Sequence, residues 1–254
     1  MRIRHTKIII PVIISLLLIA SFVIFLFYDG IFHFNNPSKT DYPIRGVDVS
    51  SYQGDIDWQV LSSEGISFAF IKATEGSAMV DNKFAYNYSE ARKTKLKIGA
   101  YHFFSFDSSA ETQADNFIAA VERFDGMLPP VIDLELYGEY MDTPPDKDHV
   151  NEQLNIMISR LEAHYGLKPI LYVTEKTYDM YVAGGYENID IWFRNVFSSP
   201  KLSDGREWTF WQFSNRHRLS GYDGIEKYID MNVFCGTAEE FADYTENGRE
   251  SILS

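Results

Sequence analysis

Two carboxylates near the middle of the chain have the type and the spacing of an acid–base pair. Asp133 and Glu135 stand in residues 129–136, and the run that leads into Asp133 is apolar, as expected of a strand that is buried on both faces. Side chains two residues apart on a strand point to the same face. Two acids in a nearly dry site repel each other and lose solvation, so at least one pKa should rise. Glycoside cleavage requires a carboxylic acid with a raised pKa beside an ionised carboxylate.

The spacing of this pair does not decide between the two stereochemical outcomes of glycoside hydrolysis. Residues two apart on a strand are about 6.6 Å apart at the backbone. That value lies between the roughly 5 Å carboxyl gap of retaining enzymes and the wider gap of inverting ones. The alternative interpretation is an edge strand with two solvated acids. That alternative is disfavoured by the apolar neighbours Val131, Ile132 and Leu134.

Two further acids stand in apolar segments near the two ends of the body of the chain. Asp48 ends the first such segment, and Asp230 lies in the last. First and last strands are neighbours in a closed barrel, so these acids would face each other across its rim. An acid in an apolar strand is costly to bury without a partner. The alternative to a place in the site is a structural role, either pairing with Arg45 or Lys72 or capping a loop.

Short apolar segments alternate with amphipathic ones along the body of the chain. The segments predicted as strands are 44–49, 67–72, 97–103, 130–136, 169–173, 190–194, 209–213 and 228–233. The segments predicted as helices are 58–63, 83–95, 110–124, 149–164 and 176–182. In this order a helix follows each of the first five strands, which predicts a parallel sheet with right-handed crossovers.

Eight strands of this kind most simply close into a barrel. We therefore predict an α/β fold: an irregular TIM-like barrel with five β/α units followed by three β-strands, preceded by one N-terminal transmembrane helix. In such a barrel the chemistry is expected at the carboxyl ends of the strands. An open, doubly wound sheet is the alternative. The chain has no Gly-x-Gly-x-x-Gly or Walker loop that would favour a nucleotide-binding version of it.

The amino-terminal end differs from the rest of the chain in charge. It holds Arg2, Arg4 and Lys7 and no acid, a charge of +3, which leaves −16 for the rest because the net charge of the 254 residues is −13. Residues 8–28 carry no charge and span about 30 Å as a helix, the thickness of a bilayer core. We predict a signal anchor there, with residues 1–7 as a cytoplasmic tail and the body outside the cytoplasm. A cleaved signal peptide is the alternative, although its apolar core is usually shorter.

The rest of the chain is predicted to form a tether over 29–43, a catalytic domain over 44–245 and a C-terminal tail over 246–254. An apolar fraction of 45% excludes disorder. Acidity disfavours nucleic acid as a partner, because Lys and Arg are needed to neutralise phosphates. One Cys excludes a disulfide framework, and the six His residues show no metal-binding spacing. We expect a monomer without metal or cofactor.

Several segments of the body resemble the glycoside hydrolase family 25 lysozymes. They are 46–50 (Gly-Val-Asp-Val-Ser), 52–54 (Tyr-Gln-Gly), 56–58 (Ile-Asp-Trp), 70–76 (Phe-Ile-Lys-Ala-Thr-Glu-Gly), 99–104 (Gly-Ala-Tyr-His-Phe-Phe), 133–135 (Asp-Leu-Glu), 211–214 (Trp-Gln-Phe-Ser) and 229–232 (Ile-Asp-Met-Asn). Each is weak alone, but they follow one another in the family's order through nearly the whole body. The resemblance implies an N-acetylmuramidase, which hydrolyses the β-1,4 bond between N-acetylmuramic acid and N-acetylglucosamine in peptidoglycan.

The resemblance also implies a role for each matched residue. Glu135 would be the general acid that protonates the leaving oxygen, and Asp133 would orient and stabilise the acetamido group of the substrate itself. The residues implied in substrate binding are Asp48, Asp230, Tyr101, Trp211, Gln212 and Lys72. The implied partners are the glycan strands of peptidoglycan and, through residues 8–28, the lipid bilayer.

Two other functions stay open on the sequence alone. The barrel of a hydrolase can serve a non-catalytic peptidoglycan-binding protein, and the same acid pair suits a hydrolase of another acetamido glycan such as chitin. Saturable glycan binding that is insensitive to Glu135→Gln would indicate the first. Products without a reducing N-acetylmuramic acid would indicate the second.

Overall fold

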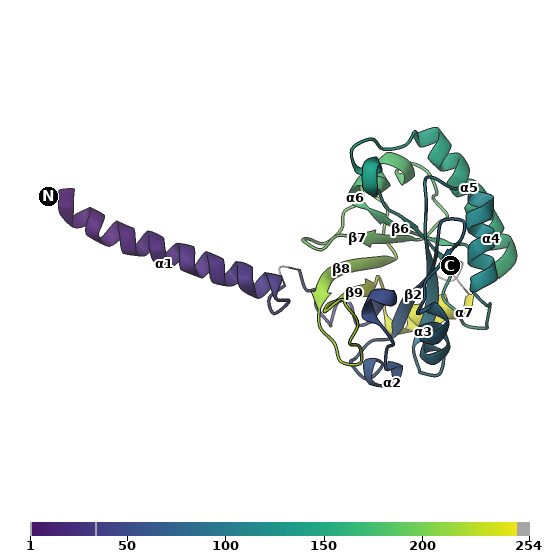
Figure 1. The fold of residues 1–254 in the computed structure, drawn as a ribbon, viewed down its shortest axis with the longest axis horizontal. Helices are drawn as coiled ribbons and strands as arrows, with labels where there is room; N and C mark the ends of the chain where they lie inside the picture. The colour runs from purple at the N-terminus through teal and green to yellow at the C-terminus, as the bar shows by residue number, and fades with distance from the viewer. Residues whose placement is uncertain (1, 34, 248–254) are drawn as a thin grey trace.

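The strands of the chain close into a barrel from which one long helix projects (Figure 1). The computed structural model describes residues 2–33 and 35–247. Its strands are β1 (Arg45–Val49), β2 (Phe68–Glu75), β3 (Met79–Val80), β4 (Lys97–Phe103), β5 (Val131–Leu134), β6 (Ile170–Thr174), β7 (Ile191–Arg194), β8 (Phe210–His217) and β9 (Ile229–Phe234). The order around the ring is β1-β9-β8-β7-β6-β5-β4-β2, and a β1–β2 pairing closes it.

The closed ring confirms the predicted barrel and excludes the open sheet. Strand β9 runs antiparallel to both of its neighbours, β8 and β1. The short strand β3 adds to β2 outside the ring. The helices are α1 (Arg2–Tyr28), α2 (Trp58–Leu61), α3 (Phe84–Ala91), α4 (Ala110–Ala120), α5 (Lys147–Tyr165), α6 (Glu175–Thr177) and α7 (Ala238–Asn247), with the helical turns η1 (Ser51–Gln53), η2 (Gly138–Met141) and η3 (Tyr178–Val182). A helix follows each of the first five barrel strands, as predicted.

Apolar side chains fill the half of the barrel interior away from the carboxyl ends of its parallel strands. Phe68 and Phe70 of β2 pack on Phe210 of β8, with ring centroids 5.2 and 5.4 Å apart. The neighbouring strands β1 and β4 place Gly46 and Gly99 against these two rings. A Cβ atom would lie 2.4 Å from the ring of Phe68 at the first and 2.5 Å from that of Phe70 at the second. Both glycines are needed because the phenylalanine rings occupy the space of a side chain.

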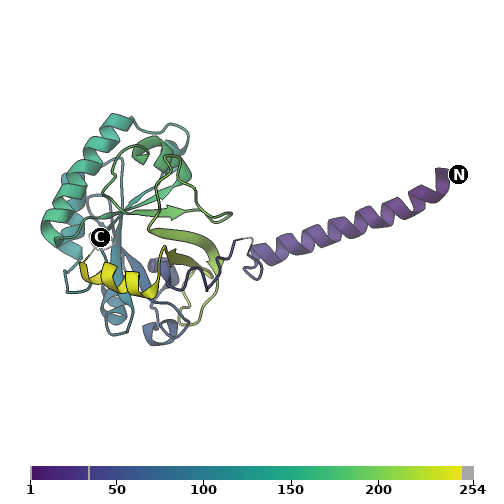
Figure 2. The same cartoon turned by 180° about the vertical axis from the view of Figure 1, so that it is seen from behind.

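Helix α7 closes this apolar end of the barrel, and the sequence did not predict it. Figure 2 shows it in yellow, lying across the barrel. Phe241 packs on Phe68, and Tyr244 packs on Phe210 and donates a hydrogen bond of 2.9 Å to Asp190. Four of its ten residues are acidic, and only Phe241 and Tyr244 are large and apolar. The helix runs two residues into the predicted tail 246–254, and the rest of that tail lies outside the described residues.

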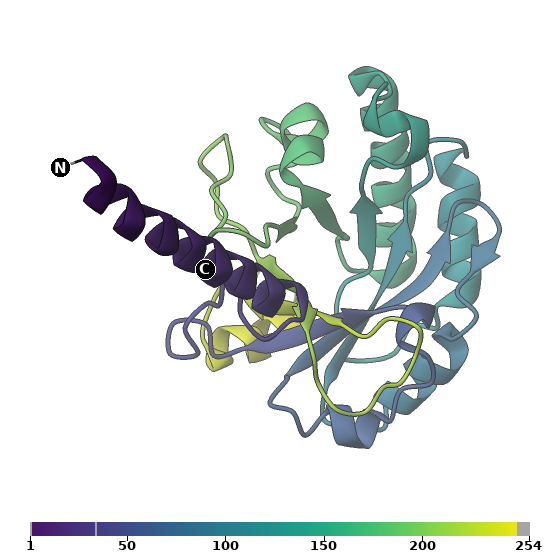
Figure 3. The same cartoon turned by 60° about the vertical axis from the view of Figure 1, so that its left-hand side comes forward.

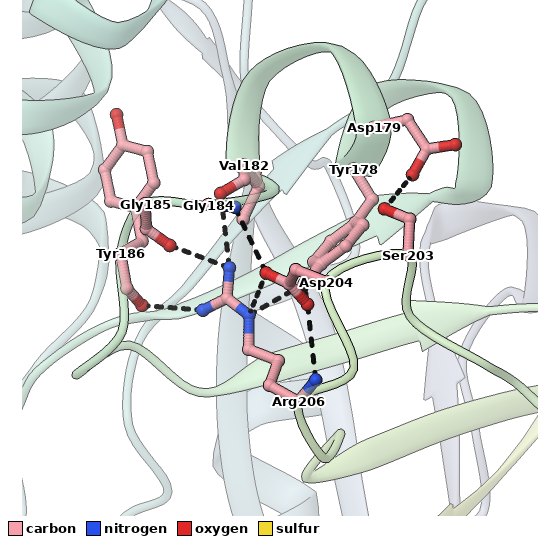
Figure 4. A network of polar contacts seen from close by, with 9 residues as sticks. All are labelled: Tyr178, Asp179, Val182, Gly184, Gly185, Tyr186, Ser203, Asp204 and Arg206. Atoms are coloured by element: carbon pink, nitrogen blue, oxygen red, sulfur yellow. Dashed lines mark hydrogen bonds and ion pairs between the residues drawn. The ribbon is translucent and has the colours of Figure 1, made fainter.

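A polar cluster holds the connection between β7 and β8, which has no helix in this structure. Arg206 donates hydrogen bonds to the carbonyl oxygens of Val182, Gly185 and Tyr186, at 3.2, 2.7 and 2.9 Å. Asp204 accepts hydrogen bonds from the hydroxyl of Tyr178 and from the N–H of Gly184, at 2.7 and 3.1 Å. Figure 4 shows the guanidinium between these groups. We call this set the Arg206 cluster; it ties the connection to the turn η3.

Helix α1 projects from the barrel with its apolar side chains exposed. Its stretch Ile9–Tyr28 is 20 residues long and apolar enough to cross a membrane by length and composition. Leu16, Leu17 and Leu18 are each at least 60% exposed, so the domain does not bury this stretch. The predicted tether 29–43, as far as the structure describes it, contacts the barrel. Arg45, for example, donates a hydrogen bond to the carbonyl oxygen of Pro37.

Candidate active site

The structure brings the four predicted acids together at the carboxyl ends of the parallel strands. Asp133 lies in β5, and Glu135 directly follows this strand. Asp48 in β1 is opposite Asp230 in β9, because the antiparallel register pairs these two residues. All four line one cleft of about 800 Å³. This is the end of the barrel where the fold places chemistry.

The carboxyl group of Asp133 is buried and incompletely paired. The residue is 7% exposed, and its Oδ1 has no hydrogen-bond partner among residues 2–33 and 35–247. Burial, and then the charge of Glu135, raise the pKa of Asp133 well above its ordinary value, although Lys72 works in the opposite direction. Burial also raises the pKa of half-buried Glu135, against the positive charge of Arg194. Both shifts favour the protonated form of each carboxyl group.

The other two acids share the amide groups of two buried side chains. Gln212 donates through Nε2 to Asp48 Oδ1 at 3.0 Å and to Asp230 Oδ2 at 3.1 Å. Asn232 donates through Nδ2 to Asp48 Oδ1 at 2.7 Å. Burial raises the pKa of Asp48 despite these bonds, and burial followed by the charge of Asp48 raises the pKa of Asp230 well above its ordinary value. The two amides thus hold a second acidic pair in place.

Two aromatic donors fix which way the amides point. The hydroxyl of Tyr172 in β6 donates to Gln212 Oε1 at 3.0 Å, and the indole N–H of Trp192 in β7 donates to Asn232 Oδ1 at 2.8 Å. With each amide oxygen occupied, each NH₂ group is directed at a carboxylate. The floor of the cleft is therefore a connected network contributed by β1, β6, β7, β8 and β9.

Seven of the eight predicted site residues line the cleft. Besides the four acids they are Tyr101, Lys72 and Gln212, the last in a smaller pocket that adjoins the main cleft and shares the four acids with it. The ammonium group of Lys72 lies 2.7 Å from Glu75 Oε2 and 5.0 Å from the ring centroid of Phe103, which places this cation at the side of the cleft.

The eighth, Trp211, lies elsewhere. Its indole is 2% exposed in the core outside the barrel, where it packs on Trp208 and donates to the carbonyl oxygen of Asn195 at 2.8 Å. The reason is the alternation of β8, since Gln212 faces the interior and its neighbour therefore faces outward. Trp211 carries no contact to the cleft in the described structure, and we do not assign it a sugar subsite.

Four residues at this end of the barrel had no predicted place in the site: Asn232, Tyr172, Trp192 and Arg194. Asn232 could have been found, because it stands two residues from Asp230 and shares its face of the strand. Tyr172 and Arg194 lie toward the carboxyl ends of β6 and β7 and point inward by the same alternation. Their types gave no sign of a role, because a tyrosine or arginine at a strand end is as often structural.

A closed barrel with an acid pair at the carboxyl ends of its strands, where burial raises the pKa of both carboxyl groups, has the layout of a glycoside hydrolase. The comparison with family models bears this out: the model described as glycosyl hydrolases family 25 matches residues 47–222. The chain belongs to this family and is a glycoside hydrolase.

Solved structures and sequence relatives are similar over most of the chain. A family 25 glycosyl hydrolase from Bacillus anthracis has 54% sequence identity and a TM-score of 0.79, covering 84% of this chain and 98% of that one. The bacterial lysozyme from Streptomyces coelicolor has 30% identity and a TM-score of 0.74, covering 81% and 98%. Lysozyme M1 from Streptomyces globisporus is 32% identical over 212 residues, which are 77% of this chain and 69% of the relative.

Proposed function

We propose that the chain hydrolyses the β-1,4 bond between N-acetylmuramic acid and N-acetylglucosamine in peptidoglycan. Membership in a family of lysozymes and muramidases supports this substrate. The observation that carries the mechanism is Asp133, a buried carboxyl group that lines the cleft with an unpaired oxygen. A substrate N–H would supply the missing partner, and an acetamido group offers one.

In the proposed mechanism Glu135 and the substrate share the chemistry. Glu135, kept protonated by burial, donates its proton to the leaving glycosidic oxygen. The acetamido oxygen of the muramic acid residue attacks the anomeric carbon and forms an oxazolinium ion. Asp133 accepts a hydrogen bond from the N–H of that ion and stabilises its positive charge. Glu135 then takes a proton from the water that opens the ring, which predicts retention of configuration.

We further propose that residues 8–28 are an uncleaved signal anchor, with residues 1–7 in the cytoplasm and the catalytic domain, residues 44–245, outside it. The exposed apolar stretch of α1 supports a span. The three cations before it and the absence of acids there support the orientation. Protease added outside intact cells should digest the domain, and the purified protein should retain its first residues by mass.

The activity is tested by digesting purified peptidoglycan and analysing the products by mass spectrometry. Products that end in reducing N-acetylmuramic acid are expected, and Glu135→Gln should abolish them. Glu139→Gln is the matched control, because Glu139 lies exposed in the nearby turn η2 and should leave turnover unchanged. Glycan binding without cleavage by the natural sequence would refute the proposal. Unchanged turnover on glycan that lacks the N-acetyl group of muramic acid would refute the substrate-assisted mechanism.

A further inference from the structure

The end of helix α1 is closed by side chains that belong to the rim of the cleft. Gly30 donates to the carbonyl oxygen of Phe27 and Ile31 to that of Leu26, at 3.1 and 2.9 Å, which is a Schellman ending. The next carbonyl, of Tyr28, accepts hydrogen bonds from Arg216 at 3.0 Å and from the hydroxyl of Tyr228 at 2.5 Å. Both partners line the cleft. Orphan carbonyls that a free helix leaves to water are here bonded to the catalytic domain.

Gly30 fits this joint for two independent reasons. Its φ is +68°, a left-handed conformation that side chains disfavour. A Cβ atom would also lie 2.3 Å from the carbonyl oxygen of Arg216 and 2.9 Å from the ring of Tyr228. The backbone of the helix end therefore rests directly on the domain.

Charged and aromatic contacts extend the joint on both sides of Gly30. The carboxylate of Asp29 lies 2.8 Å from the guanidinium of Arg218 and 2.8 Å from the ammonium of Lys227. Farther along, the ring of His33 stacks on that of His217, with centroids 3.9 Å apart. We call residues 28–33 and 35 the juxtamembrane segment; the contacts hold it on the β8–β9 connection instead of leaving it as a free linker.

The joint lies at the catalytic end of the barrel. Strand β8 ends at His217, beside the carboxyl ends of the other parallel strands, whereas α7 closes the opposite end. Figures 1 and 3 show α1 meeting the barrel where β8 passes into the yellow-green β8–β9 connection. Two large apolar side chains are exposed near the joint. Ile225, in the β8–β9 connection, is 87% exposed, and Phe197, two residues after the Asn195 carbonyl that accepts a hydrogen bond from Asn35, is 70% exposed. Exposed apolar groups next to a span suit the interfacial layer of a bilayer.

From these contacts, and resting on the proposed anchor and activity, we infer that the juxtamembrane segment holds the cleft toward the bilayer. The substrate is then glycan that lies along the extracytoplasmic surface of the membrane that α1 spans. Tyr28 both ends the apolar span and contacts Tyr228 of the cleft. No length of flexible chain therefore separates the hydrocarbon boundary from the active site. The headgroup layer on one side is only about 5–8 Å thick. Glycan farther from the membrane than the domain itself lies beyond the reach of a cleft held in this way.

The orientation is tested on the full chain in lipid vesicles that carry an energy-acceptor lipid. A donor dye is placed at Ile225→Cys or at Glu239→Cys in a Cys235→Ser background; Glu239 lies exposed on α7, at the far end of the barrel. Energy transfer should be severalfold stronger from position 225. Asp29→Lys, which repels Arg218 and Lys227, should reduce that difference. Asp115→Lys is the matched control, because it reverses an exposed aspartate that pairs with Arg160 away from the joint.

The substrate preference is tested with the same vesicles. Glycan tethered to the vesicle surface should be cleaved severalfold faster than the same glycan on separate beads. Asp29→Lys should shrink that ratio without changing turnover of soluble oligosaccharides. Equal energy transfer from positions 225 and 239 in the natural sequence would overturn the inference, and so would equal cleavage of tethered and bead-bound glycan. If no glycan is cleaved while the energy transfer is as expected, the proposed activity fails and the orientation stands.

Discussion

Two polar clusters of this protein shift the pKa of an aspartate in opposite directions. In the Arg206 cluster, burial opposes the charge of Asp204, but hydrogen bonds from Tyr178 and from backbone N–H groups outweigh it and lower the pKa of Asp204 to about 2. In the cleft, Asp133 has an unpaired oxygen and an acidic neighbour, and its pKa is raised. The first cluster uses its charge to hold a loop. The second leaves one oxygen of Asp133 without a protein partner, and in the proposed mechanism a substrate N–H binds it.

The opposite pKa shifts of Asp204 and Asp133 indicate that one cluster supports the stability of the barrel and the other its function. A carboxylate whose pKa is lowered on folding stabilises the native state above that pKa, whereas one whose pKa is raised destabilises it once the pH exceeds the ordinary value. Removing a group from the Arg206 cluster should therefore cost stability and spare catalysis. Removing one from the cleft should do the reverse.

The largest effect is expected from Asp133→Asn. The rate constant kcat should fall by about 10² to 10⁴, the range typical of losing a positioned catalytic group. The melting temperature at pH 7 should rise, because the raised pKa of Asp133 costs stability at every pH above the ordinary aspartate pKa and asparagine removes that cost. The gain should vanish below about pH 4, where aspartate is protonated in both folded and unfolded protein. Thermal unfolding at several pH values measures this, and a lower melting temperature at pH 7 would contradict it.

The next largest effect is expected from Arg206→Met, which removes the centre of the other cluster. Losing the donors to three carbonyl oxygens and to Asp204 should lower the free energy of unfolding by about 3 kcal/mol. Turnover per folded molecule should stay unchanged. Urea denaturation measures the loss, with Arg160→Met as the control for an exposed ion pair, worth less than about 1 kcal/mol. Equal losses in the two variants would show that the Arg206 cluster does not support the fold as described.

A smaller, matched pair of changes compares the clusters directly. Tyr178→Phe removes a hydroxyl that lies 2.7 Å from both Asp204 and Arg206. It should cost about 1–2 kcal/mol of stability and no activity. Tyr172→Phe frees the amide of Gln212 to turn, and kcat/KM should fall about tenfold, or about 1.4 kcal/mol. Urea denaturation and kcat/KM, measured on both variants, test this. Loss of activity in Tyr178→Phe would contradict the separation of the two clusters.

The sequence predicted the barrel because its signal is local. Apolar segments of strand length alternate with amphipathic ones, and this order survives small errors in every boundary. Helix α7 was not predicted because Phe241 and Tyr244 are its only large apolar residues, and two of their partners, Phe68 and Phe210, are distant along the chain. The role of Arg206 was not predicted for a related reason. Most of its partners are backbone carbonyl oxygens, and the residue types that carry them give no sign of the contact.

The candidate site was predictable where chemistry and alternation agree. Asp133 and Glu135 are two apart in an apolar strand, so both criteria select them. Trp211 was selected by its family motif alone, and the alternation that turns Gln212 inward turns it outward. Whether an inward residue joins a network depends on the register between strands. The register places Asp48 opposite Asp230, and neither segment alone predicts it.

The smallest effect is expected from Arg194→Gln, a change in the charge that acts on the acid. The charge of Arg194 works against burial in setting the pKa of Glu135, so its removal should raise that pKa further. A general acid is active while protonated, and activity falls as the pH rises past its pKa. The alkaline limb of kcat/KM should therefore move to higher pH, by less than about one unit. Lys176→Gln is the control, a second cation that lines the cleft but does not act on Glu135. An equal shift in both variants would mean that the net charge of the cleft determines the pH at which the alkaline limb falls. A shift confined to Arg194→Gln would tie the limb to Glu135 and to its place beside Asp133.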